Sequence, residues 1–201
     1  MKTKANFLST TMAILLVFSL SAFTVNNPNI WTNDVPHSQL FFTVTHLGIN
    51  DVSGTFDDFT VTVESSKPDF SDAVFNLTAK TNSINTRVEA RNNHLKSADF
   101  FDVEKYPELT FTSTGIQPAG ENKYKLTGDL TIHGVTKTIT VDLLYRGQTV
   151  NPMSSKLTTS FQINTTIKRS DFEVGGKFPE AIVSDEVRIV ANGEFVQADE
   201  Q

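Results

Sequence analysis

Alternation of apolar and polar residues with a period of two recurs along most of the chain, and it constrains the fold more than any other feature. Such alternation is typical of β-strands that bury one face and wet the other. A sheet built from such strands with a single buried face must close on itself or fold into a sandwich. The apolar positions fall into about eight groups, at 40–46, 56–63, 75–79, 109–111, 126–132, 139–145, 161–167 and 187–195.

Turn signals separate these groups. They include Pro118-Ala119-Gly120, His133-Gly134 and Arg146-Gly147-Gln148, which are spaced like hairpin connections. Within the second group, Phe56 lies an odd number of positions from Phe59, so we expect a bulge or bend between them. The pattern therefore predicts about eight antiparallel strands.

Segment 85–97 breaks the alternation with helix formers and no Gly or Pro. We expect a helix over about 86–97 that begins with a capping box of Thr86 and Glu89. An ordinary core helix would not bury an arginine and an asparagine, so we expect this one to lie over the mouth of a barrel. The positions i, i+3, i+4 and i+7 of its inward face are Val88, Arg91, Asn92 and Leu95.

The N-terminus has the order of a secretory signal peptide, with two lysines before an apolar run at 12–18 and small residues after it. This run is shorter than the ~20 residues of a spanning helix. We expect cleavage after Ser21 or Ala22, which divides the chain into a signal peptide at 1–22 and one domain at 23–201. The mature protein is then exported, periplasmic and soluble, and is not an integral membrane protein.

Composition excludes several classes of function. The chain has no cysteine, which removes disulfides, thiolate metal sites and a cysteine nucleophile. Its formal net charge of −6 lacks the field that holds polyanions, so we expect no nucleic-acid partner. Phe occurs 16 times against one Trp and three Tyr, which suits a large dry interior better than a hydrogen-bonding surface.

Metal ligands do not occur at a usable spacing. No two histidines share a helix face or a strand face, so we predict no metal site, although a site assembled across several strands stays open. One of them, His46, shares the inward face of Leu40 and Phe42, and we interpret it as a hydrogen-bonded core histidine. The four histidines are His37, His46, His94 and His133.

No catalytic triad is indicated, and the G-x-S-x-G motif is absent. Asp34, His37 and Ser38 lie together at the entry to a strand, where Pro36 forces a turn and the polar side chains satisfy local groups. We therefore predict no catalytic residue and no enzyme. The alternative of a hydrolase or isomerase acting on a bound lipid through Asp34, His37 or His94 stays open.

Several segments along the chain form an ordered set. They are Trp31–Asp34 with His37–Ser38, Phe42–Gly48 with Val52–Phe56, Arg91–Ser97 with Asp99–Asp102 and Tyr106–Pro107, Gly128–Lys137, and Val183–Val187. In this order they resemble the YceI-like family of exported polyisoprenoid-binding proteins. The resemblance implies an all-β fold with a single eight-stranded antiparallel β-barrel of lipocalin-like shape and a short helix near its mouth.

The resemblance also implies a ligand and partners. The ligand is an isoprenoid lipid, either a polyprenyl phosphate or an isoprenoid quinone, and the partner is a membrane-bound b-type cytochrome or a lipid-handling enzyme. One position departs from the family's Arg-x-Asp-Phe-Gly pattern, because Arg169–Phe172 is followed by Glu173. If the glycine normally holds a positive φ or leaves the ligand room, Glu173 changes the loop or the head-group contact.

These features together predict non-catalytic binding, storage or transport of an isoprenoid lipid, with no other cofactor. Burial of a tail is worth ~0.8 kcal/mol per CH₂, so an apolar lumen can hold it with few polar contacts. At the mouth, Arg91 can grip a phosphate or donate to a quinone carbonyl, with Asn92 and His94 beside it. The expected lumen residues are Leu40, Phe42, Val44, Phe56, Phe75, Leu77, Phe111, Leu126, Leu130, Val141, Leu143, Phe161, Ile163 and Ile189.

An alternative function remains. Small barrels of about eight strands can be packed solid by their own side chains. A barrel filled in this way would have no lipid ligand and would serve as an envelope stress or interaction protein. The alternation does not distinguish a filled lumen from a hollow one.

Overall fold

Long antiparallel strands dominate the computed structural model, which describes residues 28–198. The predicted signal peptide and its cleavage site lie outside the described residues. The strands are β1 (Asn29–His46), β2 (Asn50–Phe56), β3 (Phe59–Ser65), β4 (Val74–Lys80), β5 (Ile84–Asn85), β6 (Glu108–Gly120), β7 (Lys123–Ile132), β8 (Val135–Val150), β9 (Leu157–Lys168) and β10 (Glu186–Gln197). The helices are α1 (Glu89–Lys96) and the 3-10 helices η1 (Thr81–Ser83) and η2 (Arg169–Phe172).

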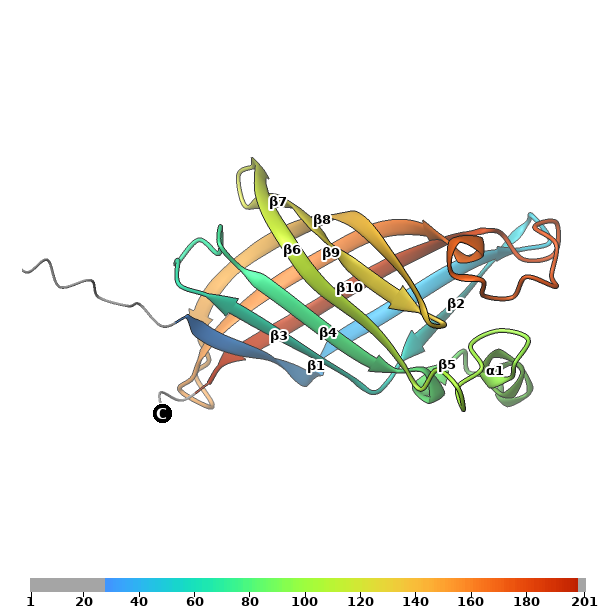
Figure 1. Cartoon of the computed structure of the whole chain (residues 1–201). Helices are drawn as coiled ribbons and strands as arrows, with labels where there is room; N and C mark the ends of the chain where they lie inside the picture. Colours follow the sequence, from blue (N-terminus) through green and yellow to red (C-terminus); the bar gives the residue numbers. More distant parts are fainter. Residues whose placement is uncertain (1–27, 199–201) are drawn as a thin grey trace, which may run out of the picture.

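Eight of the strands close into an antiparallel barrel, as predicted (Figure 1). Around the barrel they follow the order β1, β3, β4, β6, β7, β8, β9 and β10, and β10 pairs with β1 to close the ring. Closure matters because a free sheet edge is a template for pairing with other chains. Within residues 28–198, no helix is long and apolar enough to cross a bilayer.

The strand after β1 bends where the sequence predicted it. The first half of β1 pairs with β3 and the second half pairs with β2, so β2 and β3 act as two parts of one strand separated at Asp57 and Asp58. The short β5 extends the sheet beyond β2. At the end that carries α1, the wall beside β1 is therefore formed by β2 and β5 in place of β3.

One end of the barrel, which we call the closed end, is filled with aromatic rings. Phe70 comes from the loop between β3 and β4, is only 2% exposed and adopts a positive φ of 59°. Its ring centroid lies 5.6 Å from that of Trp31, 5.2 Å from that of Tyr145 and 5.0 Å from that of Phe161. Phe195 packs on Phe161 as well. The loop thus folds back to plug the lumen.

Two of the three turn signals mark turns. The chain reverses at His133 and Gly134, and it reverses directly after the Pro118–Gly120 segment. The third prediction was wrong, because Arg146-Gly147-Gln148 lies inside β8. There the register with β9 shifts between Tyr145 and Gly147, and Gly147 adopts a φ of 114°. A glycine with positive φ can form a bulge within a strand as readily as a turn.

The predicted helix is shorter than expected, and its capping box is absent. The residue before α1 is Val88, and no side chain caps the helix. Arg87 adopts a left-handed φ of 63°, which separates Thr86 from the first helical turn. The Thr86 hydroxyl instead donates to Asn92 Oδ1, so it bonds to a side chain in the middle of α1 and not to the first turn.

Candidate functional site

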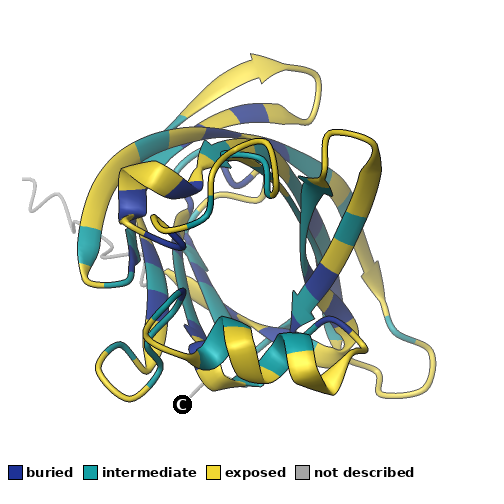
Figure 2. Cartoon of the chain, turned by 90° about the vertical axis from the view of Figure 1, so that its right-hand side faces the viewer, coloured by how far each residue is buried: buried dark blue, intermediate teal, exposed yellow. Residues whose placement is uncertain are grey.

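An apolar cavity of about 440 Å³ occupies the end of the barrel opposite the closed end, and we call this the open end. Figure 2 looks onto the open end, where α1 runs along one side of the rim. The volume falls within the ~300–1,000 Å³ range of small-molecule sites. The barrel is therefore filled at one end and hollow at the other.

Most of the predicted lumen residues line this cavity. The three that do not are Leu126, Leu143 and Phe161, which are buried at the closed end. Alternation identifies the inward face of a strand but says nothing about the distance of a residue from the plugged end. The residues that line the cavity are Leu40, Phe42, Val44, Phe56, Phe75, Leu77, Phe111, Leu130, Val141, Ile163 and Ile189.

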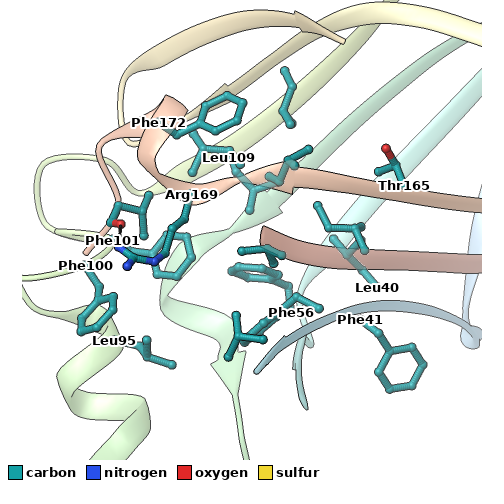
Figure 3. Close-up of a pocket in the computed structure, with 18 of the residues that line it drawn as sticks. Leu40, Phe41, Phe56, Leu95, Phe100, Phe101, Leu109, Thr165, Arg169 and Phe172 are labelled. Carbon is teal, nitrogen blue, oxygen red and sulfur yellow. Dashed lines mark hydrogen bonds between the residues drawn. The ribbon is translucent and has the colours of Figure 1, made fainter. Parts of the chain in front are cut away.

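Two irregular segments complete the cavity wall, and the sequence did not assign their residues to the lumen (Figure 3). The first follows α1 and brings Phe100 and Phe101 to the opening, where the ring of Phe101 packs edge-on against Phe56 at 5.7 Å. The second follows η2 and brings Val174 and Phe178. The pair of adjacent Phe residues was a signal, but segments without a period give no face to assign.

The two irregular segments meet across the opening and form what we call the clasp. The ring of Phe178 stacks on Phe100 with centroids 4.8 Å apart and planes inclined by 17°. His94 of α1 packs edge-on against both rings, and its Nε2 lies 3.5 Å from Asp99 Oδ2. Lys177 Nζ donates to Asp99 Oδ1 at 2.6 Å. The clasp thus ties α1 to the segment after η2.

Arg91 lines the cavity and is positioned through Thr86. Its Nε donates to Thr86 Oγ1 at 2.8 Å, and its Nη2 donates to the Thr86 carbonyl at 2.9 Å. Thr86 is fixed in turn, because its backbone N–H and its hydroxyl both donate to Asn92 Oδ1. Of the three predicted mouth residues, Arg91 and His94 line the cavity, and Asn92 supports Arg91 through Thr86.

The charged side chains that line the cavity, Arg91 and Arg169, are both basic. Among residues 28–198, none of those lining the cavity is Asp or Glu. This is notable in a chain whose formal net charge is −6. The polar or ionisable side chains that line it are those of His46, Thr86, Arg91, His94, Thr165 and Arg169.

Arg169 was not predicted as a site residue, yet it is buried beside the clasp with only 8% of its surface exposed. All its acceptors are backbone carbonyls. Nε donates to Ser184 at 3.2 Å, Nη1 to Val174 and Gly175 at 3.1 and 2.7 Å, and Nη2 to Phe178 and Val183 at 2.6 and 3.1 Å. These bonds use all five guanidinium N–H groups. Arg169 therefore holds the segment after η2 in shape as a wall of the cavity.

A second polar cluster lies outside the cavity, where β1 bulges away from β10 between Asn33 and Ser38. His37 Nδ1 lies 2.7 Å from Asp34 Oδ2, so His37 bonds locally as predicted. The predicted turn at Pro36 was wrong, because Pro36 lies inside β1. The pKa of His37 is raised by this hydrogen bond and by the charges of Asp34 and Glu194. These three side chains each bring one potential ligand atom within 4.8 Å of the others. None of them lines the cavity.

The histidine interpretations are resolved differently. His46 is exposed at the open end and lines the cavity, so its interpretation as a core histidine was wrong. The strand reaches the rim at this residue, and the lumen is open there. Of the three groups considered for catalysis, Asp34 and His37 lie within hydrogen-bonding distance of each other but away from the cavity, and His94 lines it.

The chain matches known proteins over most of its length. The family model described as YceI-like domain matches residues 31–195. The protein UPF0312 SAS2572 of Staphylococcus aureus (strain MSSA476) is 36% identical over 171 residues, which cover 82% of this chain and 96% of that protein. The protein UPF0312 SA2479 of S. aureus (strain N315) is 37% identical over 171 residues, which again cover 82% of this chain and 96% of that protein. The chain thus spans nearly the full length of these relatives.

Solved structures share the fold. The crystal structure of Burkholderia cenocepacia BcnA has a TM-score of 0.73 with 30% sequence identity, covering 81% of this chain and 98% of that one. The Campylobacter jejuni YCEI protein has a TM-score of 0.69 with 33% identity over 78% and 90% of the chains. A polyisoprenoid binding domain from Saccharophagus degradans has a TM-score of 0.64 with 17% identity over 84% and 98%. This chain therefore belongs to the YceI-like family.

Proposed function

We propose that the protein binds an isoprenoid lipid in the apolar cavity and stores or transports it without chemistry of its own. The observation that carries this proposal is the cavity of about 440 Å³, which is walled by aliphatic and aromatic side chains and opens at one end. Each CH₂ buried there contributes ~0.8 kcal/mol, so a prenyl tail needs few polar contacts. The fold that the chain shares with a polyisoprenoid binding domain supports the same class of ligand.

For the head group we propose an anion first, which makes a polyprenyl phosphate the leading ligand and an isoprenoid quinone the second. The support is the sign of charge at the cavity, where Arg91 and Arg169 lie and carboxylates are absent among the described lining residues. The five N–H groups of Arg169 are already used, whereas only Nε and Nη2 of Arg91 bond to Thr86. Arg91 is therefore the group that binds the head group, through its remaining N–H groups.

The test is the identity of the lipid that accompanies the protein. Protein purified from its own host is analysed by native mass spectrometry and by organic extraction. We expect a prenyl lipid in one-to-one stoichiometry, with a phosphate head group more abundant than a quinone. Repeated preparations that come out empty, together with no binding of a polyprenyl phosphate or a quinone, would overturn the proposal.

A variant at the mouth tests the head-group assignment. Arg91→Ala should retain the fold, because Arg91 is only half-buried, but it should lose most of the copurifying lipid. Arg87→Ala is the matched control. It removes an equal charge four residues before Arg91, and the Arg87 side chain does not line the cavity. Equal lipid retention by both variants contradicts a role for Arg91.

We also propose export to the periplasm and delivery to a membrane-bound b-type cytochrome or a lipid-handling enzyme. Export rests on the lysine, apolar and small-residue order of the N-terminus. The intact mass of the protein from a periplasmic extract tests it. We expect a chain that begins after Ser21 or Ala22, and a full-length chain confined to the cytosol contradicts it.

A further inference from the structure

The open end carries exposed apolar side chains that the barrel does not use. Leu47 and Ile49 lie in the turn between β1 and β2 and are 54% and 87% exposed. Ile182 lies in the segment before β10 and is 41% exposed. We call these three residues the apolar rim. Figure 1 places this turn and the segment after η2 together at the end of the molecule that carries α1.

The apolar rim is one surface, because backbone hydrogen bonds join its two parts. Leu47 N–H donates to the Ile182 carbonyl at 3.0 Å, and Ser184 N–H donates to the Thr45 carbonyl at 2.9 Å. His46 also forms an isolated bridge with Val183. The two segments therefore present their apolar side chains together.

Leu47 occupies a position where the backbone favours another residue. Leu47 and Gly48 have φ values of 52° and 69° and are the central residues of the β-turn over 46–49, a left-handed pair for which Asn-Gly or Asp-Gly is favoured. Leucine gains little there from packing, since it is more than half exposed. An apolar residue that goes against the turn preference and belongs to a patch of three exposed apolar side chains is evidence for contact with something outside the chain.

The cavity identifies what that contact is. Val44, Val52 and Val183, next to the apolar rim in sequence or pairing, line the cavity, and so does Ile182 itself. The apolar surface thus continues from the lumen to the outside of the molecule. A lipid leaving this cavity reaches water unless an apolar phase covers the rim. We propose that the apolar rim inserts into the surface of a lipid bilayer, so that the cavity opens toward the membrane; this inference rests on the proposed function.

The first test measures local contact with a bilayer. Because the chain has no cysteine, Ile49→Cys can carry a single environment-sensitive fluorophore. With phosphatidylcholine vesicles we expect a blue shift and quenching by brominated lipid. The control is Met153→Cys, which is 92% exposed in the turn between β8 and β9 at the closed end and should show neither. Equal responses at both positions, or none at Ile49→Cys, overturn the proposal.

The second test measures partition. Leu47→Ser with Ile49→Ser should lower flotation with phosphatidylcholine vesicles at least tenfold, whereas the matched pair Val150→Ser with Met153→Ser, also exposed, should leave it unchanged. All variants carry the same N-terminus, so that segment produces no difference between them. Equal partition contradicts the proposal. If the wild type is a dimer and only the rim variant is a monomer, the rim is an interface with a second copy of the chain, and the bilayer proposal is overturned as well.

Retention of copurifying lipid separates this inference from the proposed function. The rim variant should keep its lipid, since neither Leu47 nor Ile49 lines the cavity, but should exchange it with vesicles at least tenfold more slowly. If the wild type holds no isoprenoid yet still inserts its rim, the proposed function fails and docking stands. If the wild type holds lipid but the rim variant exchanges it at the wild-type rate, docking fails alone.

Discussion

Glu173 ends η2 in the left-handed conformation, with φ 58° and ψ 22°. This conformation costs a non-glycine residue roughly 1–2 kcal/mol. Glycine avoids that cost, but it raises the conformational entropy of the unfolded chain, which offsets part of the gain in stability. Because Glu173 is exposed, its side chain contributes little packing. We therefore expect Glu173→Gly to raise the free energy of unfolding by about 1 kcal/mol, as measured by urea denaturation. Glu173→Gln should change nothing, and a loss of stability in the glycine variant contradicts the strain argument.

Arg169 stabilises the wall of the cavity through geometry as much as through charge. Arg169→Lys keeps the charge but supplies three donors in place of five, so at least two buried carbonyls lose their partner. We expect the free energy of unfolding to fall by roughly 2–4 kcal/mol and the amides of 174–183 to exchange faster with deuterium. Arg146→Lys is the control, since that guanidinium is exposed and donates to the side chain of Gln162, and the stability of this variant should stay within ~0.5 kcal/mol of wild type.

These two residues mark the limits of sequence reasoning at the residue scale. A glycine expected at position 173 pointed to a positive φ, and the structure has one. The burial of Arg169 could not be predicted, because charged side chains are mostly exposed and its partners are carbonyls of a segment without periodicity. The side chain of Arg91 was predictable, since a helical period of 3.6 residues places it on the same face as Leu95.

Among the elements, the clasp includes the Lys177–Asp99 ion pair. The hydrogen bond and charge of Lys177 hold the pKa of Asp99 below its ordinary 3.8. A lowered folded-state pKa means that the contribution of the pair is present above pH 3.8 and is lost as the pH falls through the folded value. Acid should therefore loosen the clasp only in this low window.

The corresponding prediction concerns local opening. At pH 7, Lys177→Ala should increase amide exchange at 94–106 and 173–183 relative to wild type, and this difference should vanish once the pH is below the range in which Asp99 ionises. Hydrogen exchange at several pH values measures it. Lys80→Ala breaks an ion pair with Glu108 between β4 and β6 and serves as the control. A clasp that is insensitive to Lys177→Ala, or equally sensitive to Lys80→Ala, contradicts this assignment.

Element types were more predictable than their ends. Alternation identified the barrel strands and the bend before Phe59, because a period of two reports one-sided burial wherever it occurs. The errors fell where backbone conformation decides. Arg87 interrupts the capping box with a positive φ, and Gly147 forms a bulge where a turn was expected. Neither conformation leaves a mark in the hydrophobic pattern.

In the molecule as a whole, side chains fill the lumen at the closed end, and a cavity occupies it at the open end. The abundance of Phe predicted a dry interior but could not say which half is filled. That division depends on Phe70, whose loop returns into the barrel and whose position in the sequence has no periodic context. The rings that it contacts include Phe161, which alternation had assigned to the lumen alongside residues of the cavity. Tertiary packing, and not the sequence pattern, determines which inward-facing residues fill the lumen and which line the cavity.

Leu126 and Leu130 test this division within one strand. Both lie on the inner face of β7 and are 0% and 6% exposed, but only Leu130 lines the cavity. Leu126→Ala leaves a new void in packed surroundings and should cost about 3–5 kcal/mol of unfolding free energy. Leu130→Ala enlarges space that already exists beside the side chain, and should cost only about 2 kcal/mol. Urea denaturation of the lipid-free protein measures both.

Enlarging the same residues should reverse the order of tolerance. Leu126→Phe overpacks the closed end and should destabilise the fold by about 1–3 kcal/mol. Leu130→Phe can extend into the cavity, so it should leave stability nearly unchanged while lowering the amount of lipid retained. Equal costs for the two positions in both directions would mean that the open end is as tightly packed in solution as the closed end. In that case no space for a prenyl tail exists, and the filled-barrel alternative is the better account of the molecule.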